Sequence, residues 1–281
     1  MGILRRWRYC YRCGHAGHHD SAANNFDSGV SELTGGTTQE TRLPVDYGKD
    51  VSTLTIEPFF EGPAGSGQGG WTARQFSEHL DGPHTFALRH HVPLGYELSV
   101  AHGDTAQLLH GDVPIMEATP WAPDAVTTDP VSIEDAAEAR SKFVPFLDDN
   151  ISMTCFSCGI HPTSMQVHGA HLGDGRYATD WTVPDWATSS LTASAALWAA
   201  LDCTAAFYVC GSDGERMAFT VQYAVDERRA VTPGERVAIV GWNGDYEPVW
   251  DGRKRGAASA AFDEDGEVIA LARSFWVSAP E

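Results

Sequence analysis

Apolar and polar positions along this chain follow two kinds of spacing. Alternation of apolar with polar residues, enriched in β-branched and aromatic side chains, predicts β-strands. The alternating segments are residues 51–60, 85–92, 96–100, 177–183, 217–225, 236–242, 256–262 and 268–277, with further short strands up to residue 116. Ala73, Phe76 and Leu80 have helical spacing and predict a helix over residues 71–80. Residues 189–210 are rich in Ala and Leu and apolar nearly all round, which predicts a buried helix.

The predicted elements repeat in the two halves of the chain. Residues 86–100 (FALRHHVPLGYELSV) align with residues 223–240 (YAVDERRAVTPGERVAIV), sharing a Val, a short turn with Gly and an alternating strand. A repeat of this length indicates duplication of one α+β unit. The stretch between the halves is broken by prolines, and a short acidic helix is predicted at residues 132–142, where Ser132 precedes Asp135 by three positions.

The first 40 residues differ from the rest. They are rich in Gly, Ser, Asn and His without apolar periodicity, which predicts a disordered leader. A zinc site within this leader is an alternative, because thiolates and imidazoles suit Zn²⁺ and the leader holds Cys10, Cys13, His15, His18 and His19. We expect a leader (1–40), an N-terminal domain (41–120), a linker (121–150) and a C-terminal domain (151–281).

The charge of the chain argues against two classes of partner. With 19 Lys and Arg against 38 Asp and Glu, the formal net charge is −19. Such a surface repels phosphate backbones and anionic membranes, so neither nucleic acid nor membrane is expected as a partner. We expect no apolar run to approach the roughly 20 residues that cross a bilayer. The basic start lacks the apolar stretch of a signal peptide, and we therefore expect a cytoplasmic location.

Four segments resemble a known family. They read GQGG (67–70), CFSCGIHP (155–162), ALDCTAAFYVC (200–210) and SAAFDEDGEVIALAR (259–273). CFSCGIHP resembles the Cys-Phe-x-Cys-Gly-x-x-x-Pro opening of many hotdog thioesterase-like proteins. ALDCTAAFYVC is similar to the carboxylate-bearing helix of phenylacetate-pathway-type acyl-CoA thioesterases. The last segment looks like the final hairpin of that superfamily, and GQGG is similar to its Gly-Gly helix entry.

This resemblance, which covers about residues 41–281, implies both a fold and an activity. The fold is α+β: a double hotdog whose two antiparallel sheets, or one continuous sheet, each wrap around a long central helix. The activity is hydrolysis of an acyl-CoA or acyl-carrier-protein thioester, without a cofactor or metal. In such enzymes a carboxylate attacks the thioester or activates water, while N–H groups at the start of the buried helix hold the oxyanion. Those N–H groups lack intrahelical partners, and the helix dipole favours negative charge there.

Asp202 is the candidate catalytic carboxylate. It stands in an otherwise apolar helix, where an ionised side chain is costly unless it is paired or used. Burial raises the pKa of a carboxyl group and can suit it to acid–base chemistry. Alternatively, Asp202 only accepts a hydrogen bond from a buried donor. The His-Gly-Gly helix entry of the family is missing here, since residues 193–195 read Ala-Ser-Ala.

The first half shows the opposite pattern. It has Gly69 and Gly70 at the helix entry, but Ser77 and Glu78 stand where the carboxylate would be. We therefore expect one composite site, in which Gly69 and Gly70 supply amides, Gln68 holds the water or acyl carbonyl, and Asp202 supplies the carboxylate. A tight turn before a helix is the alternative role for the glycine pair. The residues expected to bind substrate are Trp71, Ser77, Glu78, Ser194 and Trp198.

Other motifs give weaker alternatives. Residues 65–70 match Gly-x-Gly-x-x-Gly but lack the βαβ context of a dinucleotide site. A second zinc site at Cys155, Cys158, His161, His168 and His171 is an alternative, since two thiolates and two imidazoles would complete a tetrahedron. A non-catalytic binder of acyl groups or small molecules and an enoyl-thioester hydratase or dehydratase are the alternatives to a thioesterase. An open sheet edge favours a homodimer or higher homo-oligomer.

Overall fold

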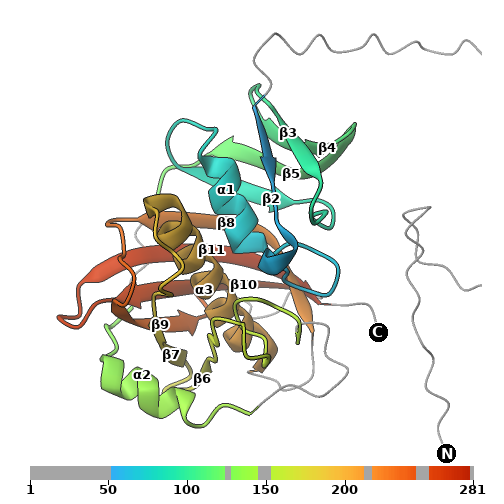
Figure 1. Cartoon of the computed structure of the whole chain (residues 1–281). Coiled ribbons are helices and arrows are strands. Elements are labelled where there is room, and N and C mark those ends of the chain that lie inside the picture. The colour runs from blue at the N-terminus through green and yellow to red at the C-terminus, as the bar shows by residue number, and fades with distance from the viewer. Residues whose placement is uncertain (1–51, 124–127, 145–152, 212–216, 245–252, 279–281) are drawn as a thin grey trace, which may run out of the picture. The chain divides into compact units, whose positions relative to one another are not determined.

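The strands of this protein form one continuous sheet. The computed structural model describes residues 52–123, 128–144, 153–211, 217–244 and 253–278, all within the compact unit Asp46–Glu281. In these residues eleven antiparallel strands are hydrogen-bonded in the order β1-β3-β4-β5-β2-β8-β11-β10-β9-β7-β6 (Figure 1). Their bounds are β1 Thr53–Thr55, β2 His84–Leu88, β3 Glu97–Ala101, β4 Ala106–His110, β5 Val113–Pro120, β6 Ala170–His171, β7 Tyr177–Thr182, β8 Ala218–Glu227, β9 Arg236–Trp242, β10 Lys254–Phe262 and β11 Val268–Ser278.

The strand order contains an internal symmetry. Outward from the centre, β2-β5-β4-β3-β1 on one side corresponds to β8-β11-β10-β9-β7 on the other, and β6 extends the second side. The two sets join where β2 pairs with β8, with Phe86 opposite Tyr223. These two residues also open the two aligned segments of the sequence repeat, which therefore corresponds to β2–β3 and β8–β9.

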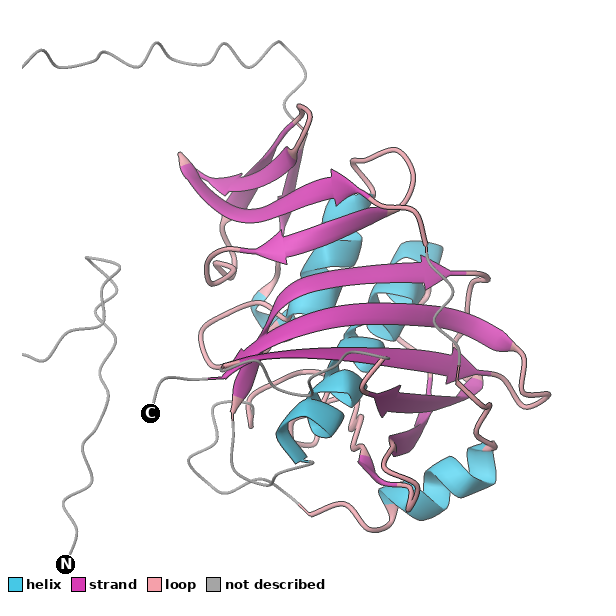
Figure 2. Ribbon diagram, turned by 180° about the vertical axis from the view of Figure 1, so that it is seen from behind, coloured by secondary structure: helices cyan, strands magenta, loops and turns pink. Residues whose placement is uncertain are grey.

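Two helices lie side by side on one face of the sheet, as both views show (Figures 1 and 2). The first, α1, spans Gly69–Ser77, and the second, α3, spans Ser190–Gly211. The sequence predicted α3 to within one residue. In the first half, however, the expectation of a long helix is wrong, because α1 has only 9 residues. It gives way to turns around Gly82, whose φ of 78° suits glycine.

Helix α3 is the centre of the largest apolar cluster. By length and composition its 22 residues are enough to cross a membrane, so the expectation that no apolar run approaches that length is wrong. Yet 94% of its most apolar window is buried inside the protein. Its small alanines let the sheet approach closely: a Cβ on Gly241 of β9 would lie 2.7 Å from the carbonyl oxygen of Thr204. The helix is thus packed as a core element.

The third helix, α2 (Ile133–Arg140), covers the opposite face of the sheet. Along β9, Val237 and Ile239 belong to the cluster around α3, whereas Ala238 and Val240 pack with α2, as the alternation of a strand requires. The predicted cap is confirmed, since the Ser132 hydroxyl accepts a hydrogen bond from the Asp135 N–H at 3.0 Å.

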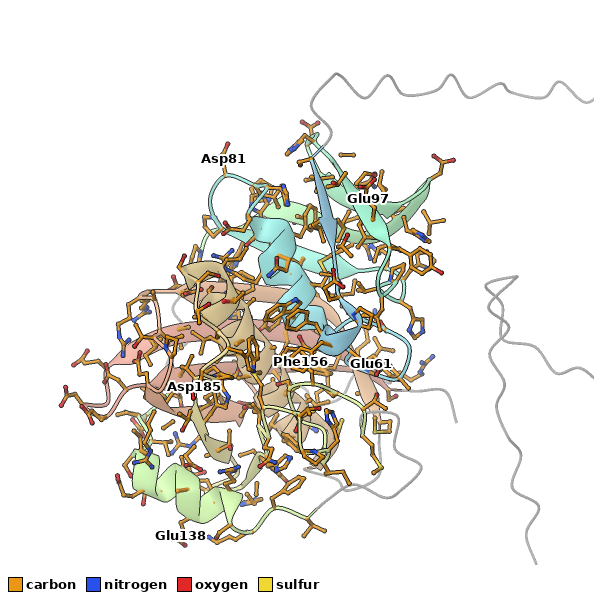
Figure 3. All side chains as sticks on the ribbon, viewed as in Figure 1. Glu61, Asp81, Glu97, Glu138, Phe156 and Asp185 are labelled. Carbon is orange, nitrogen blue, oxygen red and sulfur yellow. The ribbon has the colours of Figure 1, made fainter. Side chains whose placement is uncertain are left out.

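The first predicted strand is shorter than expected. It ends at Thr55, and Pro58–Phe60 form a 3-10 helix (η1), where Pro58 lacks the N–H that a strand ladder uses. Labelled acids such as Asp81, Glu97 and Glu138 project from the periphery, while Phe156 lies inside (Figure 3). The predicted leader and its zinc ligands lie outside the described residues.

Candidate functional site

Gln68 connects the start of α1 to α3. As the N-cap residue, it accepts a hydrogen bond from the Trp71 N–H through Oε1 at 2.7 Å. Its Nε2 donates to Oδ2 of Asp202 at 2.6 Å. Because one partner is a donor and the other an acceptor, the two contacts fix the orientation of the amide. The side chain is 2% exposed, so these contacts are shielded from water.

Asp202 is a buried carboxylate in the middle of α3, only 4% exposed. The Thr220 hydroxyl of β8 donates to its Oδ1 at 2.8 Å, and the Gly70 N–H also stabilises the charged form. Burial raises the pKa of Asp202 to about 7, with a further contribution from the nearby Cys155, while the donors Thr220, Gly70 and Gln68 oppose the rise. The sequence-based expectation of a raised pKa is therefore met.

The two glycines after Gln68 permit close contact between the helices. A Cβ on Gly70 would lie 2.6 Å from the Trp198 carbonyl oxygen, and one on Gly69 would lie 3.1 Å from a Leu88 methyl group and 3.5 Å from Oδ2 of Asp202. A side chain at Gly70 would therefore push α1 away from α3. Gly69 lines a cavity, and the first N–H groups of a helix have no intrahelical partner. The Gly69 amide thus differs from that of Gly70, which is directed at Asp202.

A cavity of about 260 Å³ opens beside this carboxylate. Gln68, Gly69 and Asp202 line one part of it, and the rest is largely apolar. Its apolar and sulfur-bearing lining comes from α3, β8 and β11 and includes Cys203, Ala206, Phe207, Cys210, Phe219 and Trp276. A basic run of Arg89, His90 and His91, which follows β2, contributes a polar part of the lining. The cavity therefore combines a carboxylate, a helix N-terminus and an apolar interior.

Three thiols also meet at this cavity. The sulfur atoms of Cys155, Cys158 and Cys203 lie within 4.8 Å of one another, and all three residues are buried. The histidines of the alternative zinc site are not part of this group. His161 lies 3.1 Å from the carbonyl oxygen of Thr154, and His168 stacks on Phe143.

His171 likewise has another partner, since its Nδ1 accepts from the Gly173 N–H at 2.8 Å. The mixed Cys–His cluster, an alternative from sequence, is therefore not formed by these residues. Histidines close along the chain are not close to the thiols in space, and the third sulfur comes instead from α3.

The five expected substrate-binding residues do not line this cavity. Trp71 is buried and stacks on Phe60 with ring centroids 3.7 Å apart. The other four, Ser77, Glu78, Ser194 and Trp198, gather at the opposite end of the α1–α3 contact. Ser77, Glu78 and Trp198 line a separate groove of about 460 Å³.

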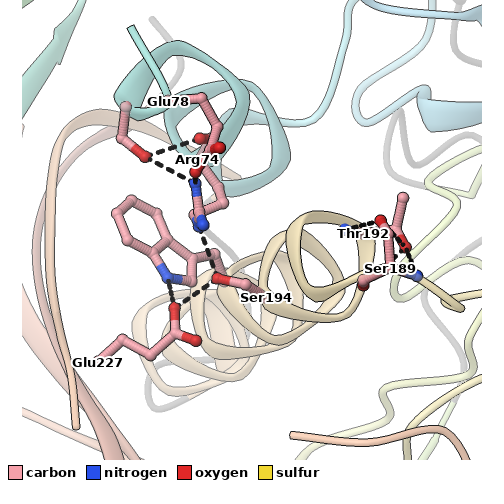
Figure 4. Close-up of polar contacts among 8 residues, drawn as sticks. Arg74, Glu78, Ser189, Thr192, Ser194 and Glu227 are labelled. Carbon is pink, nitrogen blue, oxygen red and sulfur yellow. Dashed lines mark hydrogen bonds and ion pairs between the residues drawn. The ribbon is translucent and has the colours of Figure 1, made fainter. Parts of the chain in front are cut away.

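Arg74 and Glu227 organise that second groove (Figure 4). Arg74 donates to Ser194 at 2.6 Å and to Ser77 at 3.1 Å, and it pairs with Glu78. Glu227 accepts from the Ser194 hydroxyl and, at 2.8 Å, from the Trp198 indole N–H. Side-chain contacts thus join these six residues, Arg74, Ser77, Glu78, Ser194, Trp198 and Glu227, in one network.

Sequence reasoning missed Thr220, Cys203 and Glu227. A polar residue in an alternating strand carries no signal of a partner in α3, so Thr220 was not detectable. The sequence did contain a signal for Cys203, because this residue follows Asp202 directly in an apolar helix. Only the fold, however, brings it to a Cys-x-x-Cys pair 48 positions away.

Comparison with known proteins gives a fold but no close relative. No protein family and no curated protein matches the sequence. Among solved structures, a candidate thioesterase from Novosphingobium aromaticivorans matches 81% of this chain and 95% of its own, with TM-score 0.56 and 12% identity. A candidate thioesterase II from Thermobifida fusca matches 83% and 94%, with TM-score 0.52 and 13% identity. The chain thus shares its overall fold with these two solved structures.

Proposed function

We propose that this protein hydrolyses acyl thioesters at one composite site between its two halves. In this proposal each half is a hotdog unit, and the repeated strand order supports that interpretation. Asp202 acts as the general base. It takes a proton from a water molecule, and the water oxygen bonds to the thioester carbonyl carbon. The carbon–sulfur bond then breaks while Asp202 passes that proton to the sulfur, which releases a thiol and a carboxylic acid and restores the carboxylate.

The Gly69 N–H would receive the oxyanion that forms on the carbonyl oxygen. Gln68 and Thr220 would act as positioning residues, because each holds one oxygen of the Asp202 carboxylate. The observation that carries the proposal is this carboxylate beside a helix N-terminus at an apolar cavity. A structural role for Asp202 alone would not require the cavity.

The size of the cavity limits what it encloses. About 260 Å³ lies just below the range of roughly 300–1,000 Å³ that is common for small-molecule sites. We infer that the acyl group enters the cavity and that the rest of the thioester stays outside.

Coenzyme A is favoured over an acyl carrier protein as the thiol component. Arg89, His90 and His91 form a basic run at the cavity of a chain whose net charge is −19. Phosphate groups fit this run, whereas the acidic surface repels a carrier protein that is itself acidic.

The test is hydrolysis of a panel of acyl-CoAs, followed with a thiol reagent, for the full chain and its Asp202→Asn variant. Asparagine keeps one acceptor for Gln68 and gains a donor for Thr220, so folding should be retained. We expect a loss of about 10²–10⁴-fold in kcat. Asp226→Asn is the matched control, because Asp226 lines the second groove instead.

Three outcomes would contradict the proposal. Undiminished turnover by Asp202→Asn would remove Asp202 from the reaction. Hydration of an enoyl-CoA, followed by ultraviolet absorbance, without hydrolysis would favour a hydratase. Tight acyl-CoA binding without any turnover would favour a non-catalytic binder.

A further inference from the structure

The three buried thiols beside Asp202 come from two places in the chain. Cys155 and Cys158 lie in a tight turn closed by a hydrogen bond from the Gly159 N–H to the Cys155 carbonyl oxygen, 2.8 Å long. The turn requires glycine at position 159, because a Cβ there would lie 2.5 Å from the Cys155 carbonyl oxygen. Cys203 approaches from α3. Local backbone geometry thus brings two sulfurs together, and tertiary packing adds the third.

The spacing of the sulfurs matches that of thiolates sharing one metal ion. Zinc–sulfur bonds of about 2.3 Å at tetrahedral angles separate two sulfurs by about 3.8 Å. The sulfurs of Cys155 and Cys203 are 3.8 Å apart, and Cys158 lies within 4.8 Å of both. A disulfide would require about 2.05 Å, so the group has the dimensions of a metal site rather than of a covalent bridge.

Hydrogen-bond donors surround this thiol group. The backbone N–H groups of Ser157 and Cys158 lie beside the Cys155 sulfur. The amide Nε2 of Gln68 lies 3.8 Å from the Cys203 sulfur, in addition to its contact with Asp202. Donors of this kind stabilise metal-bound thiolates and orient them. The neighbouring carboxylate of Asp202 has its two oxygens engaged by Gln68 and Thr220.

We propose that Cys155, Cys158 and Cys203 bind one soft divalent cation, zinc being the fitting ion, with the fourth position open to the cavity. The openness follows from the lining, since all three cysteines line the cavity. A water molecule or a ligand thiol from the cavity completes the tetrahedron. Thiols bind as thiolates, so each thiol that ligates the ion releases a proton to solvent.

This proposal does not depend on thioester hydrolysis and is tested by binding alone. The full chain is prepared with Cys10→Ser and Cys13→Ser, which removes the thiols of the leader as competing ligands. Zinc content is measured by elemental analysis. Co²⁺ is then titrated into metal-free, reduced protein, and the sulfur-to-cobalt charge-transfer band and the visible bands of tetrahedral Co²⁺ are followed.

We expect about one metal ion per chain and a charge-transfer band in this parent protein. Cys203→Ser should weaken Co²⁺ binding at least tenfold and reduce the band. Cys210→Ser is the matched control, because Cys210 lines the same cavity from the same helix but is outside the three-sulfur group, and it should leave binding unchanged. Absence of a charge-transfer band in the parent, or equal binding by the Cys203→Ser and Cys210→Ser variants, would overturn the proposal.

Discussion

Gln68 donates a hydrogen bond to Asp202 at 2.6 Å although 134 positions separate the two residues. The same side chain caps α1 through Trp71, so a local cap and a long-range contact depend on one amide. A buried carboxylate needs such a partner, and here the partner belongs to the other half of the chain. The site is therefore complete only when both halves are packed together.

Replacing this amide should destabilise the fold. Gln68→Ala leaves the buried Asp202 short of a donor and removes the cap of α1, and we expect a loss of about 1–3 kcal/mol in the free energy of unfolding. Urea unfolding measures it. Gln107→Ala is the control, since Gln107 makes only a 3.3 Å contact with Glu117 and should change stability by less than about 0.5 kcal/mol. Equal losses of unfolding free energy in both variants would mean that the contacts of Gln68 with Asp202 and Trp71 do not stabilise the fold.

A methyl group added between α1 and α3 should also destabilise the fold. Gly70→Ala would place Cβ 2.6 Å from the Trp198 carbonyl oxygen, and relief of that clash requires α1 to move away from α3. We expect a loss of about 1–3 kcal/mol in the free energy of unfolding. In Gly103→Ala the nearest atom would be 3.5 Å away, so unfolding should be nearly unchanged. A stable Gly70→Ala variant would show that the α1–α3 contact adapts freely.

A substitution in the basic run Arg89-His90-His91 tests whether the thiol component of the substrate is coenzyme A. His90→Gln removes a phosphate-binding group at the cavity, and we expect KM for an acyl-CoA to rise several-fold with little change in kcat. For the N-acetylcysteamine thioester of the same acid, which has no phosphates, KM should not change. His102→Gln, at an exposed histidine that does not line the cavity, is the control. A similar rise in KM for both substrates would contradict recognition of phosphates.

Sequence alone predicts the features that depend on neighbouring residues and misses those that depend on residues far apart in the chain. Strong local periodicity predicted α3 and the strands at residues 236–242 and 268–277 within one residue. A common site for Asp202 and Gln68 was also expected, but only through a family resemblance, and Gln68 was expected to hold the water or acyl carbonyl rather than to donate to Asp202. By contrast, no local pattern indicates that Cys203 joins Cys155, because that contact depends on tertiary packing. The domain limits, the homo-oligomer and the cytoplasmic location remain predictions from sequence.

The second groove provides a test of the single-site proposal. The groove contains Arg74, whose guanidinium is already engaged by Ser77, Glu78 and Ser194. Arg74→Gln breaks that network, and Glu227→Gln weakens the acceptor for the Trp198 indole. Because neither residue lines the cavity at Asp202, we expect kcat/KM for an acyl-CoA to stay within about twofold of the parent for both variants, measured well below their unfolding temperatures. A loss approaching that of Asp202→Asn would instead place a second reacting centre in this groove, since disturbance of a distant, stable network does not remove a transition-state contact.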